Sequence, residues 1–351
     1  MSATRDAIDQ ASATARVKMA RVEREAIASL ERLYRDAADQ LIQDIARLSA
    51  ADGTLQLTVL QSYLEQVRTV LQVIKTERGD LLLASLQRAA ELGAAVWATG
   101  PAIDVLAVAA VQFVDAFTGA DGLKLSDRLW RLDQGAQQSI AETLRRNILL
   151  GRDASKAAAE WVARDEAVPL AIRQQAQMGT TERLGTVVAE RLHRAPGSAY
   201  ADALRVFRTE MNRAHGQAYQ AGAAGHPDVI GMKFNLSPSH PKPDQCDLHA
   251  HANLHGLGDG VYPVGQAPWP AHPNTMSYLT AVFRDEVSTA DRAGKADRLN
   301  WLRNQPEIKQ DQLLGKAKAA ALRAGMLNEA DIYTPWRDLK RRYERRGYQF
   351  D

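Results

Sequence analysis

The chain has little cysteine, little net charge and no long apolar run. A single cysteine, Cys246, excludes an internal disulfide framework and fits a reducing compartment. The net charge of +2, with 25% charged residues, does not describe a polycation that coats nucleic acid by bulk charge. With 351 residues, 45% of them apolar, the chain has room for two or three domains with a real core.

The sequence also indicates neither a signal peptide nor a transmembrane helix. The first ten residues contain no apolar core of the kind that a signal peptide needs, so export is not indicated. The most apolar region, residues 92–114, is interrupted by Pro101 and Asp104. Its uninterrupted part is about half of the ~20 residues that span a bilayer. We therefore predict a buried helix there.

Most of the chain has a helical pattern. Between residues 17 and 48 apolar side chains recur three and four apart, and the pattern resumes from residue 60 to 74 after a turn at 51–53. These stripes predict a long antiparallel hairpin. We expect further helices over residues 81–97, 103–117, 126–151, 155–163, 169–192 and 199–221.

The pattern changes near residue 229. Residues 229–236 alternate apolar with small or polar side chains and predict a strand. Helices return after residue 278. We therefore predict a mainly α fold with a small α+β module, in four regions: an elongated helical region (1–120), a helical body (121–228), a strand with a proline- and histidine-rich loop (229–285), and a helical basic tail (286–351).

Residues 237–278, here called the proline-histidine segment, are the most informative stretch. The segment carries five of the eight histidines, the only cysteine and more than half of the prolines. Proline breaks regular structure, so side-chain bonds, a metal ion or a partner must hold the segment in shape. We favour an ordered hydrogen-bonded loop that is anchored by Trp269 and the prolines, with no cofactor.

Two alternatives use the same side chains. Thiolate, imidazole and carboxylate are zinc ligands, so a zinc ion could be held by Cys246, His249, His251 and His272. A metal-dependent nuclease or hydrolase centred on this loop is the other alternative, with an imidazole activating water. Catalysis needs a strand pair and a helix to bring such groups together, whereas here the groups are expected in a loop.

Two charged stretches stand outside the segment. Glu210 and Arg213 are spaced to pair weakly on one helical face, which we expect to be solvated. Near the C-terminus, a basic run predicts sequence-independent contact with DNA phosphates through Arg337, Arg341, Arg342, Arg345 and Arg346. Its other interpretation is a solvated last helix whose cations complement the helix dipole.

Several of these pieces occur in the order seen in one family. A stretch at residues 122–130, Gly-Leu-Lys-Leu-Ser-Asp-Arg-Leu-Trp, precedes a long helix, and later come the strand and a glycine-rich stretch at 256–263. The motif residues are Arg208, Thr209, Glu210, Asp244, Cys246, Asp247, His272, Pro273 and Asn274. Over residues 120–285 the chain resembles the phage Mu F-like minor head (head morphogenesis) proteins of tailed bacteriophages.

The resemblance implies a structural component of a phage head and no catalytic residues. Such a protein is made in the bacterial host cytoplasm, is built into the virion near the portal vertex, and aids head assembly, DNA packaging or DNA ejection. The implied partners are the portal protein, the major capsid protein and packaged double-stranded DNA, with no membrane and no small-molecule substrate. One departure stands out: the family's cysteine after His-Pro-Asn is Thr275 here.

Overall fold

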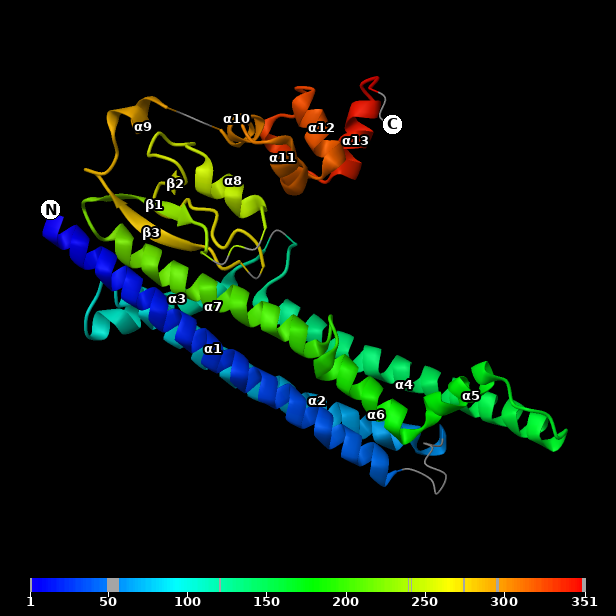
Figure 1. Cartoon of the computed structure of the whole chain (residues 1–351). Coiled ribbons are helices and arrows are strands. Elements are labelled where there is room, and N and C mark those ends of the chain that lie inside the picture. Colours follow the sequence, from blue (N-terminus) through cyan, green and yellow to red (C-terminus); the bar gives the residue numbers. More distant parts are fainter. Residues whose placement is uncertain are drawn as a thin grey trace. The chain divides into compact units, whose positions relative to one another are not determined.

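The computed structural model of the chain is mainly helical, with one small antiparallel sheet (Figure 1). It describes residues 2–48, 57–119, 121–238, 240, 242–273, 275–294 and 297–348, without the side chains of residues 2, 57 and 58. The predicted fold class is therefore confirmed. The predicted turn at 51–53 lies outside the described residues. None of the described helices is both long and apolar enough to cross a bilayer.

The helices before the sheet include all the long ones among the described residues. They are α1 (Ser2–Arg47), α2 (Leu57–Ala94), α3 (Pro101–Ala116), α4 (Leu125–Ala163), α5 (Leu170–Ala176), α6 (Thr181–Ala189) and α7 (Ala199–Ala224). A 3-10 turn, Gln177–Gly179, precedes α6, and a π-helical turn, Glu190–Arg194, follows it.

The sheet and the later helices are short. They are β1 (Val229–Asn235), α8 (Gln245–His251), β2 (Val261–Tyr262), β3 (Tyr278–Phe283), α9 (Thr289–Ala293), α10 (Arg298–Arg303), α11 (Glu307–Leu314), α12 (Lys316–Arg323) and α13 (Trp336–Glu344), with a 3-10 turn at Glu329–Ile332. The strand order is β2-β1-β3, and Met232 pairs with Tyr262 on one side and with Ala281 on the other. The predicted strand at 229–236 is confirmed by β1.

The chain divides into two compact units that cut across the four predicted regions. One unit comprises residues 1–17, 90–110 and 212–351, and the other comprises residues 18–89 and 111–211. The first is here called the sheet unit and the second the helical unit. Helices α1 and α7 each contribute residues to both units.

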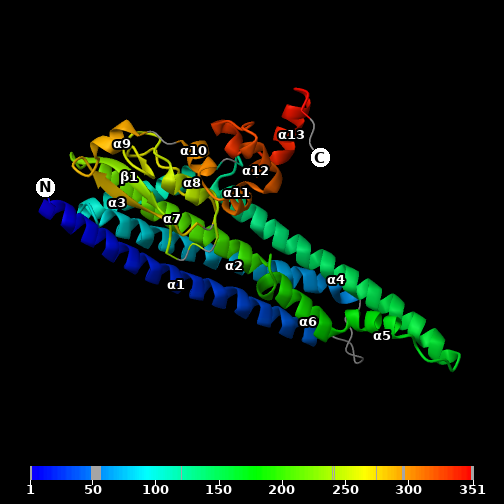
Figure 2. The same cartoon turned by 45° about the horizontal axis from the view of Figure 1, so that its top comes forward.

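Three helix predictions need correction. Residues 57–94 form one helix, so the helix expected at 81–97 is the end of α2. Helix α4 does not stop at Gly151. This glycine instead allows a close approach of another segment, since a Cβ there would lie 2.4 Å from the Gly179 nitrogen. Helix α5 returns along α4 (Figure 2). Helix α3 is only partly buried, since Val105 and Val108 are exposed.

The core of the helical unit follows the predicted apolar stripes. Leu30, Leu41 and Ile45 of α1 are fully buried, as are Tyr63 and Ile74 of α2. The predicted packing face of these helices is therefore confirmed.

One charged side chain lies inside the helical unit. The Arg78 side chain is 2% exposed, and its guanidinium donates two hydrogen bonds to the Asp133 carboxylate, at 2.7 and 3.0 Å. The same guanidinium donates to the Tyr34 hydroxyl at 3.3 Å. A buried cation is tolerated when it is paired and hydrogen-bonded, so these bonds fix how α2 and α4 meet.

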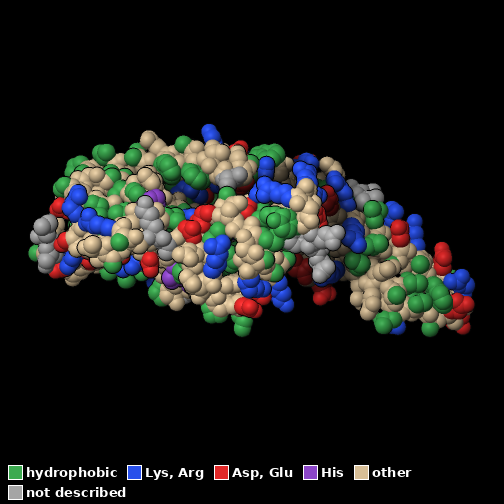
Figure 3. All heavy atoms as spheres, turned by 90° about the horizontal axis from the view of Figure 1, so that it is seen from above, with side chains coloured by type: hydrophobic (Ala, Val, Ile, Leu, Met, Phe, Trp, Pro, Cys, Tyr) green, Lys and Arg blue, Asp and Glu red, His purple; other side chains and the backbone are tan. Residues whose placement is uncertain are grey.

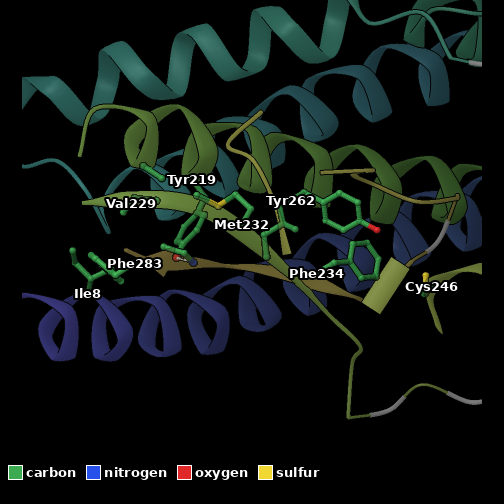
Figure 4. Close-up of a cluster of buried hydrophobic side chains, with 11 residues drawn as sticks. Ile8, Tyr219, Val229, Met232, Phe234, Cys246, Tyr262 and Phe283 are labelled. Carbon is green, nitrogen blue, oxygen red and sulfur yellow. Dashed lines mark hydrogen bonds between the residues drawn. The ribbon is translucent and has the colours of Figure 1, made fainter. Parts of the chain in front are cut away.

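The sheet unit is assembled around α7. The Tyr219 hydroxyl lies 3.0 Å from the Ser12 hydroxyl of α1 and accepts a hydrogen bond of 3.1 Å from the Ala281 amide of β3. Met232 and Phe234 of β1 are fully buried in the same cluster. Figure 4 shows Ile8 at one end of this cluster and Cys246 at the other. The sheet is thereby packed against α7, which directly precedes it, and against the start of α1, which lies about 200 residues earlier in the sequence.

Substitution of Asp133 by alanine tests the buried pair. We expect Asp133→Ala to lower the free energy of unfolding by about 3–5 kcal/mol, because the buried Arg78 guanidinium loses its carboxylate. Urea unfolding followed by circular dichroism measures this loss. Glu65→Ala is the matched control, since it breaks the exposed ion pair with Arg68 and should cost less than ~1 kcal/mol. Equal losses in the two variants would contradict the assignment.

Candidate functional site: the proline-histidine segment

The proline-histidine segment is seated on α7. A Cβ at Gly216 would lie 2.0 Å from the Trp269 indole nitrogen, so glycine is what lets the indole ring lie against the helix. That indole nitrogen donates a hydrogen bond of 3.3 Å to the Asn212 carbonyl. The Asn212 side-chain amide donates to the carbonyl of Thr275 at 2.9 Å. Trp269 is therefore an anchor of the segment, as the sequence predicted.

Part of the segment is a helix that the sequence analysis expected to be a loop. Helix α8 starts after Asp244, whose carboxylate accepts a hydrogen bond of 2.7 Å from the Cys246 amide. In return, the Asp247 carboxylate accepts one of 3.0 Å from the Asp244 amide. This reciprocal cap satisfies two backbone donors at the helix start. His249 and His251 are consequently held on a helix, so the expectation that they lie in a loop is wrong.

Three potential ligands converge at the start of α8. The Cys246 sulfur lies 3.1 Å from the His272 Nε2 atom, and that nitrogen lies 3.2 Å from a carboxylate oxygen of Asp244. The ligand atoms of these three residues all lie within 4.8 Å of one another. Cys246 is 1% exposed, whereas His272 and Asp244 are partly exposed. The Thr275 hydroxyl lies 3.5 Å from the sulfur.

The Cys246 thiol is not activated for nucleophilic attack. Burial raises the pKa of the thiol to about 11, above its ordinary value of 9.0, although hydrogen bonds from Thr275 and Ser277 lower it. Only the thiolate is a good nucleophile, and reactive cysteines have lowered pKa values. The surroundings of Cys246 therefore favour a buried neutral thiol when no metal is bound.

A second polar cluster adjoins the first. The Asp247 carboxylate lies 2.9 Å from the His240 Nε2 atom and 3.3 Å from the Lys309 ammonium of α11. Burial by itself raises the pKa of Asp247, but the Asp244 amide, His240 and Lys309 together hold the pKa below its ordinary value. Asp247 therefore stays ionised and ties the segment to α11.

The other predicted zinc ligands point elsewhere. His249 is buried with its ring between Phe234 and Tyr333, and burial holds the pKa of His249 at about 4, with Arg298 and His272 lowering it further. His251 stacks on Trp301 at a centroid distance of 4.8 Å. Neither belongs to a group of converging ligands among the described residues.

Of the predicted zinc set, the structure thus brings together Cys246 and His272 and adds Asp244. The predicted zinc set of four residues left out Asp244 and His240. The signal that could have found Asp244 is the Asp-x-x-Asp spacing of a helix cap, which places one carboxylate beside the first turn. The position of His240 depends on Asp247, and nothing local in the sequence indicated it.

The Arg-Thr-Glu motif on α7 is not a solvated face. Thr209, Glu210 and Arg213 are all buried, and Glu210 is only 2% exposed. The Glu210 carboxylate forms an ion pair with Arg128 on α4, at 3.5 Å. Burial of the motif follows from this tertiary contact, since nothing in the local pattern of α7 distinguishes the face as buried.

Three further residues belong to the motif of the family resemblance: Arg208, Pro273 and Asn274. The Pro273 carbonyl accepts a hydrogen bond of 2.9 Å from His272, whereas Asn274 lies outside the described residues. Arg208 pairs with Glu23 at 3.1 Å.

The predicted DNA-contact arginines fall into two groups. Arg342 donates to the fully buried Asp331 at 2.7 Å, and Arg337 pairs with its neighbour Asp338. The exposed Arg341, Arg345 and Arg346 complete the run. On the face shown in Figure 3, basic and acidic side chains are interspersed.

Comparisons with protein-family models, with curated proteins and with solved structures found no match for this chain.

Filling the space at Gly216 tests how the segment is seated. We expect Gly216→Ala to lower the free energy of unfolding by about 1–3 kcal/mol, because the new methyl group forces the Trp269 indole off α7. Hydrogen exchange followed by mass spectrometry should show faster exchange in peptides that cover residues 264–278. Gly79→Ala on α2 is the control: a Cβ there meets nothing within 4 Å, so stability should stay the same or rise by up to ~1 kcal/mol. Unchanged exchange in Gly216→Ala would contradict the seating.

Proposed function

We propose that this protein is a minor head protein of a tailed bacteriophage, of the Mu F-like kind, located in the virion near the portal vertex. The observation that carries the proposal is that separate elements of the resemblance contact one another. Within the helical unit, Arg128 of the 122–130 stretch pairs with Glu210 of the Arg-Thr-Glu motif. Within the sheet unit, the same helix α7 holds the segment through Asn212 and Trp269. Motifs that are scattered in the sequence but joined in space support one shared structural role.

The hydrogen bonds of the proline-histidine segment favour a structural role for it over a catalytic role. Asp244 and Asp247 cap α8, and Asn253 donates to the carbonyls of Asp291 and Gly294. The Tyr262 hydroxyl donates to the His249 carbonyl. These polar groups are used to hold backbone in place. The hydrolase alternative would require His249 and His251 to meet at one metal, and their rings instead stack on Tyr333 and Trp301.

The helices also suit an assembly role. Exposed apolar side chains occur on α3, where Val105 is 70% exposed and Val108 is 47% exposed. Exposed apolar groups on a helix favour contact with another protein surface. In the proposed function the portal protein and the major capsid protein supply such surfaces, and no catalytic step is assigned.

The direct test is the protein content of assembled particles. We expect the chain to be present in purified phage heads and to be retained by the portal protein when the two are co-expressed. Gly216→Ala should reduce incorporation several-fold because it unseats the proline-histidine segment, whereas Gly79→Ala should not. Mass spectrometry of gradient-purified heads measures incorporation.

Two results would overturn this proposal. One is the absence of the chain from assembled heads. The other is cleavage of DNA by the purified protein with Zn²⁺, Mn²⁺ or Mg²⁺, abolished by His249→Ala or His251→Ala. The second result would establish the hydrolase alternative, since alanine at either histidine would then remove turnover without blocking assembly.

Contact with packaged DNA is a separate part of the proposal. We expect replacement of Arg341, Arg345 and Arg346 by glutamine to weaken binding to double-stranded DNA. The plot of log binding constant against log salt concentration should become shallower by up to ~3, because about 0.9 counterion is released for each phosphate contact. Fluorescence anisotropy at several salt concentrations measures this slope.

The control for this test removes the same charge elsewhere. Arg131, Arg145 and Arg146 are exposed on α4, and their replacement by glutamine should leave the slope nearly unchanged. An equal decrease in both triple variants would indicate a bulk charge effect and would contradict DNA contact through the C-terminal run.

A further inference from the structure

The three groups at the start of α8 include no lysine or arginine, so positive charge among them must come from a second proton on His272 or from a bound cation. A backbone carbonyl can only accept a hydrogen bond, so the contact of 2.9 Å between His272 Nδ1 and the Pro273 carbonyl requires the proton on Nδ1. In a neutral ring, the Nε2 lone pair is then free. That lone pair points toward the Asp244 carboxylate oxygen at 3.2 Å and the Cys246 sulfur at 3.1 Å.

Two acceptors at this distance need a proton or a cation between them. A thiol hydrogen on Cys246 could satisfy one contact of Nε2, but it leaves the carboxylate oxygen facing a lone pair. A second proton on the ring would make His272 an imidazolium that donates to Asp244, and it would leave the sulfur as a second acceptor of the same hydrogen. A metal ion would satisfy all three atoms at once. A divalent cation with one thiolate, one carboxylate and one neutral imidazole carries no net charge, which suits a position where the sulfur is 1% exposed.

The positions of the three groups are fixed by other bonds. The first carboxylate oxygen of Asp244 accepts from the Cys246 amide at 2.7 Å, which leaves its second oxygen to face His272. The Gln245 side chain donates to the Ala271 carbonyl at 2.9 Å and joins the two ligand-bearing stretches. A histidine that donates its second nitrogen to a carbonyl is the usual outer arrangement of a metal-bound imidazole.

We propose that Asp244, Cys246 and His272 form a Zn²⁺ site with three protein ligands and a fourth position that faces solvent. Sulfur, nitrogen and oxygen donors in this combination select zinc among the common divalent ions. Partial exposure of Asp244 and His272 provides the path by which the ion enters. Binding displaces the thiol proton to solvent as the sulfur–zinc bond forms.

Metal content of the full chain tests the site. We expect one zinc ion per chain by elemental analysis after purification with zinc and gel filtration. Replacement of zinc by Co²⁺ should give a thiolate-to-cobalt charge-transfer band in the near ultraviolet. Zinc should also raise the Tm in a concentration-dependent manner, because the ion binds only the folded site. Cys246→Ser and His272→Gln should lose stoichiometric zinc and the rise in Tm.

The matched control is His251→Gln, the same replacement in the same segment at a ring that stacks on Trp301. It should keep one zinc ion per chain. Absence of zinc from the folded unaltered chain, or full zinc retention in both ligand variants, would overturn the site. Should Cys246→Ser fail to fold, the cobalt spectrum of the unaltered chain decides: its charge-transfer band supports the site, and no such band overturns it.

The tests of the zinc site and of the virion role have separate outcomes. Zinc bound by a chain that is absent from heads would keep the site and overturn the proposed function. A chain that enters heads without ever binding zinc would overturn the site and keep the proposed function. DNA cleavage by the zinc-loaded protein would keep the site and replace the proposed function by the hydrolase alternative.

Discussion

The absence of a side chain at Gly216 is the constraint on which the sheet unit depends. It gives the Trp269 indole room against α7, and the indole nitrogen then reaches the Asn212 carbonyl. A segment rich in proline has few backbone donors and little regular structure of its own. The segment acquires a fixed shape by packing on α7, where Gly216 leaves room for the Trp269 ring. The bond from the Gln245 side chain to the Ala271 carbonyl then keeps the stretch that carries Cys246 beside the stretch that carries His272.

Buried charge is handled by the same means in both units. Arg78 is paired with Asp133 in the helical unit, and Asp247 is paired with His240 and Lys309 in the sheet unit. The pairs of Arg78 with Asp133 and of Asp247 with Lys309 join elements that are distant in the sequence, so they contribute specificity as well as compensation for lost hydration. The group formed by Asp244, Cys246 and His272 differs because it includes no lysine or arginine, so that only a proton on His272 or a bound cation supplies positive charge there.

The proposed structural role and the proposed zinc site are compatible. An ion at the start of α8 would join two stretches of a segment that hydrogen bonds already hold, and so would stiffen a scaffold. The resemblance to phage head proteins rests on ordered motifs alone, and the contacts of Arg128 with Glu210 and of Asn212 with Thr275 give those motifs a physical connection.

The sequence by itself determined the elements whose stability comes from a repeating apolar face. The stripe of Leu30, Leu41 and Ile45 and the alternation of β1 required no partner to be recognised, because period and burial are linked. Helix α8 escaped prediction since seven residues are too few to show a period, and its stability comes from the Asp244 cap and from burial of Leu248. Burial of Glu210 and the meeting of Cys246 with His272 were decided only by the tertiary structure. Their partners lie 82 and 26 residues away, and a pattern read along the chain carries no information on which distant groups will meet.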